Sequence, residues 1–212
     1  MSDPHAIATR EDLRAITGEA GERPAGKVID HIDPLCARFI AASPFVLLAT
    51  RGADGLLDLS PKGDPAGFVA VLDDKTLALP DRLGNKRFDS FENVLHSPEA
   101  ALIFLIPGHN DTLRVAGKAR LTRDPDLCER LAVNGRPAQF VLLLTVEEAY
   151  LHCAKCMIRS RMWQPDNWPD TSDVPSLAEA MVAHGKLVEK KLVADVDEMA
   201  QIIADDAKNR LY

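Results

Sequence analysis

The sequence predicts a mainly β, α+β fold in which six or seven antiparallel strands form a small barrel with flanking helices. Two observations predict this class. Apolar β-type runs recur in pairs that are joined by short polar turns, which is the spacing of β-hairpins. Few helical stretches separate the runs, so an open parallel sheet with helical crossovers does not fit. Closing the strands into a barrel would also remove the exposed edges of an antiparallel sheet.

The elements follow one another in a clear order along the chain. Residues 11–16 form a short helical segment, and Leu35, Phe39 and Ile40 give a second helical stretch an apolar face. A helix between Gly84 and Pro98 interrupts the strands. A shorter helix is expected over 124–131, and an acidic amphipathic helix over 193–211. The β-type runs are 45–50, 56–60, 67–72, 76–79, 100–106, 112–121 and 139–151.

Length and composition suit one domain with terminal additions. We interpret residues 1–44 as an N-terminal helical extension that packs on the barrel, 45–163 as the barrel, and 164–212 as a C-terminal helical extension of the same domain. A half-open barrel would leave apolar side chains such as Leu142 and Leu144 with too little cover, which predicts a homodimer.

Charge and hydropathy exclude several classes of partner. The net charge of −7 makes nucleic acid a poor partner, although a local basic cluster can still capture a small anion. No apolar run approaches the roughly 20 residues that span a bilayer, and the N-terminus lacks the pattern of a secretory signal. We therefore expect a cytoplasmic protein with free cysteines and no membrane contact.

Two clusters of basic and polar side chains are candidate binding elements. The first, residues 59–65, contains Ser60 and Lys62, and taken alone it is also typical of a solvated turn. The second contains Arg82, Asn85, Lys86 and Arg87, where a strand is expected to end and a helix to begin. Unpaired amides and the helix dipole make such a start a natural anion site. The alternative is that these side chains point into solvent.

The third cluster, residues 152–163, follows the last strand and contains Lys155, Arg159 and Trp163. An exposed basic helix is the alternative to a binding role. Cys153 and Cys156 match the C-x-x-C spacing of redox and zinc sites. No second pair of ligands appears at a usable spacing, so we expect no metal and interpret the motif as a strand end that turns into a helix.

Four motifs together carry a resemblance to a known family: Ser60-Pro61-Lys62, Asn85-Lys86-Arg87, Val115 to Leu121, and His152 to Cys156. In this order they resemble the FMN-binding split barrels related to pyridoxamine 5'-phosphate oxidase, over about Phe45 to Trp163. The chain is most similar to a bacterial PPOX-class subfamily of flavoproteins with unassigned activity. That subfamily carries S-P-K-G-D-P, L-P-D-R-x-G-N and H-C-A-K motifs, all of which are intact here.

The resemblance implies a homodimer that holds FMN at the interface between two barrels. Basic and hydroxyl side chains near the first hairpin and the intervening helix would hold the phosphate, and a second group, in part from the partner subunit, would lie near the flavin ring. Carried onto this sequence, the phosphate group is Lys62, Asn85, Lys86 and Arg87 with support from Ser60 and Arg82, and the ring group is Thr112, Lys155, Arg159 and Trp163.

The resemblance also implies an FMN-dependent oxidoreductase that transfers hydride at flavin N5 to or from a small organic substrate. It singles out no catalytic acid or base. The C-terminal elements by which the oxidase grips its substrate phosphate have no counterpart after Asn167, so oxidation of vitamin B6 is not expected. The alternative is a protein that binds flavin, haem or deazaflavin without turnover, because fold does not decide function.

Overall fold

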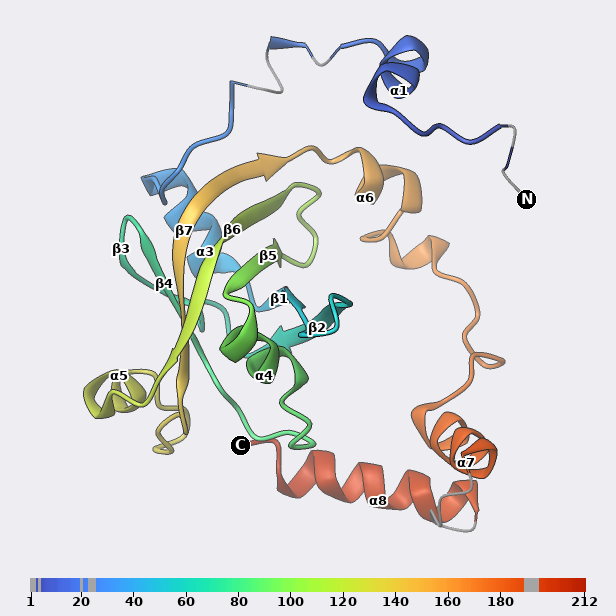
Figure 1. Ribbon diagram of the computed structural model, residues 1–212. Coiled ribbons are helices and arrows are strands. Elements are labelled where there is room, and N and C mark those ends of the chain that lie inside the picture. The colour runs from blue at the N-terminus through green and yellow to red at the C-terminus, as the bar shows by residue number, and fades with distance from the viewer. Residues whose placement is uncertain (1–2, 4, 20, 23–25, 189–194) are drawn as a thin grey trace.

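The computed structural model describes residues 3, 5–19, 21–22, 26–188 and 195–212 (Figure 1). Its centre is one antiparallel sheet of seven strands in the order β2-β1-β5-β6-β7-β4-β3, which confirms the predicted class. The curled sheet encloses the main core. The strands are β1 (Phe45–Arg51), β2 (Leu57–Gly63), β3 (Ala70–Asp73), β4 (Thr76–Pro80), β5 (Glu99–Leu105), β6 (Thr112–Thr122) and β7 (Val141–His152).

The barrel is split because its two edge strands, β2 and β3, do not pair with each other within the described residues. The predicted hairpins are present: β1 pairs with β2, β3 with β4, and β5 with β6. The expected last strand is β7, the longest, which pairs with both β6 and β4. The third strand begins at Ala70, later than expected, because Gly67 adopts a left-handed turn conformation with φ of 84°.

A bulge in β6 lets it approach β7 closely. The register between the two strands shifts between Ala116 and Gly117. A Cβ atom built on Gly117 would lie 1.9 Å from the main-chain oxygen of Thr145. Only glycine leaves that space free, so this position of the Val115–Leu121 motif maintains the longest ladder of the sheet.

The core lies inside the curled sheet and includes the apolar side chains that were expected to need cover from a second chain. Leu142 and Leu144 are 0% and 1% exposed, so they belong to the core and need no cover from a second chain. Neighbouring strands and helices bury the inner face of β7, an arrangement that the periodicity of one strand does not reveal. Within the sheet, edge strand β2 exposes large apolar side chains, since Leu57 and Leu59 are 83% and 62% exposed.

Helix α3 (Pro34–Ala42) packs against β3, β6 and β7. Asp33 caps it by accepting a hydrogen bond from the Cys36 amide at 2.7 Å, and Pro34 suits its first turn. The helix buries Phe39 and Ile40 as expected, whereas Leu35 is exposed. Helix α1 (Arg10–Thr17) buries no residue and lies away from the sheet in Figure 1.

Three further helices connect or cover the strands. Helix α4 (Asp89–His96) contacts β1, β2 and β6, and it begins later than the sequence predicted. Within it Val94 is buried, whereas Leu95 is exposed. Helix α5 (Pro125–Arg130) precedes β7, and helix α6 (Lys155–Ser160) follows it, with the short 3-10 turn η1 (Pro165–Asn167) next.

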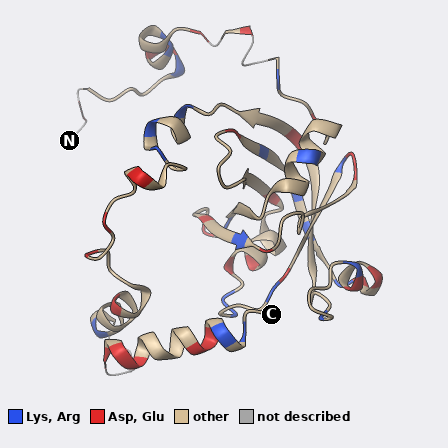
Figure 2. Cartoon of the chain, turned by 180° about the vertical axis from the view of Figure 1, so that it is seen from behind, with Lys and Arg blue, Asp and Glu red and all other residues tan. Residues whose placement is uncertain are grey.

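The C-terminal part forms a helical hairpin of α7 (Leu177–Leu187) and α8 (Val196–Asn209). The ribbon of α8 is red in Figure 2 where its acidic residues lie. The two helices share a small core of Ala178, Val182 and Met199. Residues 193 and 194, where the last helix was expected to begin, lie outside the described residues. Within the described ranges, no helix has the length and apolar character needed to cross a membrane.

Candidate functional site

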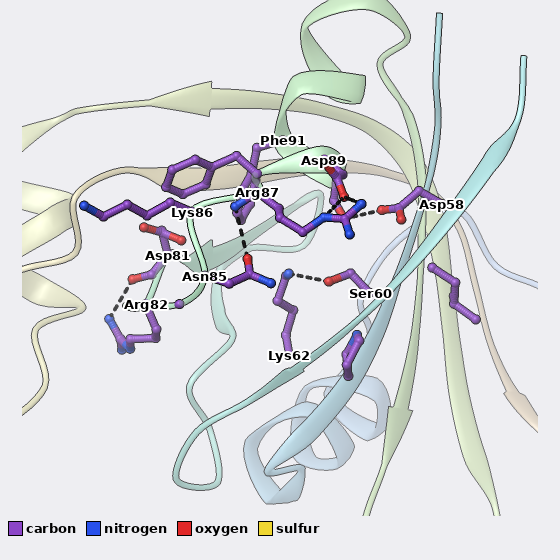
Figure 3. Close-up of a pocket in the computed structure, with 15 residues that line it drawn as sticks. Asp58, Ser60, Lys62, Asp81, Arg82, Asn85, Lys86, Arg87, Asp89 and Phe91 are labelled. Atoms are coloured by element: carbon purple, nitrogen blue, oxygen red, sulfur yellow. Dashed lines mark hydrogen bonds and ion pairs between the residues drawn. The ribbon is translucent and has the colours of Figure 1, made fainter. Parts of the chain in front are cut away.

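A cavity of about 400 Å³ lies between β2, the segment after β4 and the start of α4 (Figure 3). Its volume is within the range of small-molecule sites. Burial alternates along β2, so that Asp58, Ser60 and Lys62 lie on the half-buried side of the strand. The cavity contains all six residues predicted to hold a phosphate: Ser60, Lys62, Arg82, Asn85, Lys86 and Arg87.

Lys62 is the most enclosed of the cations that line the cavity without a carboxylate partner. Its ammonium donates to the Ser60 hydroxyl at 2.6 Å and lies 5.2 Å from the centre of the Phe91 ring. Burial lowers its pKa, although the nearby carboxylates Asp81 and Asp58 act in the opposite direction. No ion pair of Lys62 is found among the described residues. A bound anion would offset the cost of burying this charge.

The segment before α4 corrects the expected helix start. Lys86 and Phe88 have left-handed backbone conformations, with φ of 59° and 56°, so the helix cannot extend back through them. The Asn85 side chain accepts a hydrogen bond from the Arg87 amide at 3.0 Å, which stabilises a turn. The first turn of α4 carries Asp89, as is usual beside a positive dipole end. The basic side chains therefore extend from a loop and not from the first turn of the helix.

Ion pairs already engage two of the basic side chains. Arg87 contacts the Asp89 carboxylate at 2.7 Å, but both side chains are well exposed. The Arg82 Nε atom lies 2.5 Å from an Asp64 oxygen, and these side chains are 19% and 2% exposed. Arg82 is thus part of a buried pair that shapes the cavity wall, whereas Lys86 has no ion pair within the described part of the chain.

Sequence reasoning missed the acidic side chains of the cavity. Asp58 accepts a hydrogen bond from the Ser90 hydroxyl at 2.5 Å and so joins β2 to α4. The two-residue period of the strand could have placed Asp58 beside Ser60. Asp81 is only 7% exposed, and burial raises its pKa. Nothing in the local sequence indicates that Asp81 is buried.

The other four predicted residues lie elsewhere. Thr112 is buried at the start of β6, and Lys155 and Arg159 are exposed on α6. The Trp163 indole donates to the main-chain oxygen of His109 at 2.8 Å, which ties it to the turn between β5 and β6. Within the described chain, none of the four lines the cavity. Their contribution across a dimer interface stays a prediction.

The C-x-x-C motif lies where a strand ends and a helix begins, as the sequence predicted. Strand β7 ends at His152 and α6 begins at Lys155, and both cysteines are free and exposed. Within the described residues, no group of three or more His, Cys, Asp or Glu side chains could hold a metal ion.

The donors of the cavity fit a phosphate group. Lys62, Ser60, Asn85 and Arg87 lie around one space in Figure 3, and the ion pair of Arg87 is exposed. Lys86 lines the same cavity, but its side chain extends away from the other four. Charge-assisted hydrogen bonds from such groups are the strongest that side chains offer to phosphate oxygens. The cavity walls also carry carboxylates, which repel a polyanion. They favour instead a ligand with one compact anionic group and further polar groups that form hydrogen bonds.

Three solved structures that are similar to this protein each cover a little more than half of the chain. HupZ from Group A Streptococcus is 17% identical, with 57% of this chain and 93% of that chain covered and a TM-score of 0.47. A Lactobacillus delbrueckii protein, provisionally described as a pyridoxamine 5'-phosphate oxidase, is 26% identical, with 58% and 98% covered and a TM-score of 0.47. An FMN-binding protein from Syntrophomonas wolfei is 12% identical, with 55% and 84% covered and a TM-score of 0.43.

No curated protein matches the sequence significantly. The family assignment therefore rests on a sequence profile described as pyridoxamine 5'-phosphate oxidase, which matches residues 32–153. That range begins just before α3 and ends just after β7, so it includes the whole sheet and every residue of the cavity. The chain belongs to the pyridoxamine 5'-phosphate oxidase family.

Proposed function

We propose that the protein is an FMN-binding flavoprotein that catalyses oxidation or reduction of a small organic substrate. One observation carries the proposal: the six residues implied by the family resemblance meet in one cavity, although they come from two separate segments of the sequence. A flavin nucleotide has both kinds of group. Its phosphate can bind the basic donors, and its hydroxyl groups can form hydrogen bonds with the remaining polar walls.

Each side chain has a distinct task in this proposal. Lys62, Lys86 and Arg87 hold the phosphate, the Asn85 amide and Ser60 hydroxyl orient it, and Arg82 supports the wall through Asp64. The bound flavin supplies the hydride chemistry, as cofactors generally do. The protein supplies orientation and positive charge that stabilises developing negative charge.

The identity of the ligand tests this proposal directly. Heat should release FMN from the purified protein, and chromatography distinguishes FMN from FAD and riboflavin. Recovery of FAD or haem alone, or of no ligand after reconstitution, contradicts the proposal. Anaerobic mixing with NADPH then tests turnover, because an oxidoreductase should lose its flavin absorbance. A flavin that no nicotinamide donor reduces would favour a binding protein without turnover.

Arg87→Ala should weaken FMN binding about tenfold, because one charge-assisted contact to phosphate is lost. The loss is at the low end for a charge-assisted contact, since the Asp89 carboxylate already neutralises part of the Arg87 charge. Riboflavin has no phosphate, so its affinity should not change. Arg10→Ala, an exposed change on α1, is the matched control. Equal loss for FMN and riboflavin would show that Arg87 does not hold the phosphate.

We also propose that two copies associate through edge strand β2. Its outer face exposes Leu57 and Leu59, and an unpaired apolar edge favours association. Leu57→Glu, which lies outside the cavity, should therefore convert a particle of twice the chain mass into a monomer, as measured by light scattering. Leu187→Glu, a comparably exposed leucine on α7, should leave the dimer intact. A monomeric wild-type protein with full flavin occupancy would contradict this proposal.

A further inference from the structure

The segment after α8 returns to the barrel at Tyr212. Figure 1 shows the C-terminal end of α8 beside the loop that follows β4. The Tyr212 hydroxyl donates to Oδ1 of Asp64 at 2.8 Å, across 148 positions of sequence. Arg136, in the turn before β7, donates to the main-chain oxygen of Tyr212. Two separate parts of the barrel therefore hold this one residue.

Asp64 connects Tyr212 to the cavity. Its side chain is 2% exposed, and its second oxygen, Oδ2, accepts from Arg82 at 2.5 Å. The carboxylate thus receives the tyrosine on one oxygen and the arginine on the other. A buried carboxylate depends on both donors, because an oxygen left without a partner there is costly. The position of the Arg82 side chain is therefore linked to the docking of Tyr212.

Tyr212 also lies directly behind the cavity wall. It lines a second, smaller cavity of about 130 Å³ together with Asp81, Arg82 and Leu83. Asp81 and Arg82 line the larger cavity as well, so this short segment separates the two spaces. The tyrosine supports one side of the segment whose other side faces the proposed phosphate site.

We propose that Tyr212 is a positioning residue for the phosphate cavity, which it orders through Asp64 and Arg82. The identity of the ligand rests on the proposed function, whereas the ordering of residues 81–87 is a property of the chain alone. By linkage, whatever stabilises the docked tyrosine strengthens binding in the cavity, and a ligand in the cavity strengthens docking.

Hydrogen exchange on the ligand-free protein tests the ordering. Tyr212→Phe keeps the ring and removes the donor to Asp64. The two hydrogen-bonded amides of residues 81–87, those of Asp81 and Arg87, should then exchange about threefold to tenfold faster. Amides of α7 should exchange as in the wild type. Tyr150→Phe is the matched control, because Tyr150 lies on β7 and lines neither cavity. Unchanged exchange in residues 81–87 overturns the proposal whether or not the protein binds flavin.

FMN titration tests the consequence for the site. Tyr212→Phe should raise the Kd for FMN about threefold to tenfold. In an Arg82→Ala background the same change should have no further effect, because the tyrosine acts through that arginine. A full additional loss in that background, or unchanged FMN affinity in the single variant, overturns the proposal. Absence of FMN binding to the wild type contradicts the proposed function, and the exchange result then decides the role of Tyr212.

Discussion

Lys62→Met should weaken FMN binding about tenfold to a hundredfold, because a partly buried ammonium makes a stronger contact with phosphate than an exposed one. Lys62 already contacts Ser60 and the Phe91 ring, so little side-chain freedom is lost when the ligand binds. Fluorescence titration with FMN and riboflavin measures the effect, and riboflavin affinity should be nearly unchanged. Lys118→Met, an exposed change on β6, is the control.

The same substitution should leave the ligand-free fold as stable as before or more stable. Burial lowers the pKa of Lys62, so the folded chain binds this proton less well than the unfolded chain. The charge therefore destabilises the folded state at neutral pH, and this cost is lost as the pH rises toward the ordinary pKa of lysine. Methionine removes the charge and can pack on the Phe91 ring. A large drop in the urea midpoint, with FMN and riboflavin weakened equally, would contradict this account.

Gly117→Ala should lower the free energy of unfolding by about 3 kcal/mol or more, because the added methyl overlaps main-chain atoms. Its Cβ would lie 1.9 Å from the Thr145 oxygen and 3.1 Å from the Glu147 nitrogen. Neither atom can rotate away as a side chain could, so β6 and β7 must separate where the bulge joins them.

Urea unfolding measures this change. Gly84→Ala is the matched control, since its Cβ would meet nothing closer than 4.0 Å and should change stability little. A Gly117→Ala protein within about 0.5 kcal/mol of the wild type would show that the strands have room at the bulge.

Local patterns predicted the strands well because turn chemistry and two-residue periodicity act over short distances. The hairpin of β5 and β6 is an example, since an apolar run meets a polar turn at Pro107 to Asp111 and returns. The predicted start of α4 was wrong because the Asn85 side chain accepts a hydrogen bond from the Arg87 amide, which competes with a helical turn. Apolar spacing alone does not report such a local hydrogen bond.

Features that join distant segments could not be predicted from periodicity. The meeting of Ser60 and Lys62 with Asn85 to Arg87 was implied by family resemblance, because no local rule brings β2 beside the loop before α4. The Asp64–Tyr212 contact spans 148 positions and had no sequence signal. The cover of Leu142 and Leu144 likewise depends on which elements pack against β7.

A crystal structure of the FMN complex tests the central claim most directly. The account predicts that the phosphate lies in the cavity between β2 and the start of α4, in hydrogen-bonding contact with Lys62 and with residues 85–87. A flavin whose phosphate lies outside this cavity, with Lys62 still bonded only to Ser60, would contradict it.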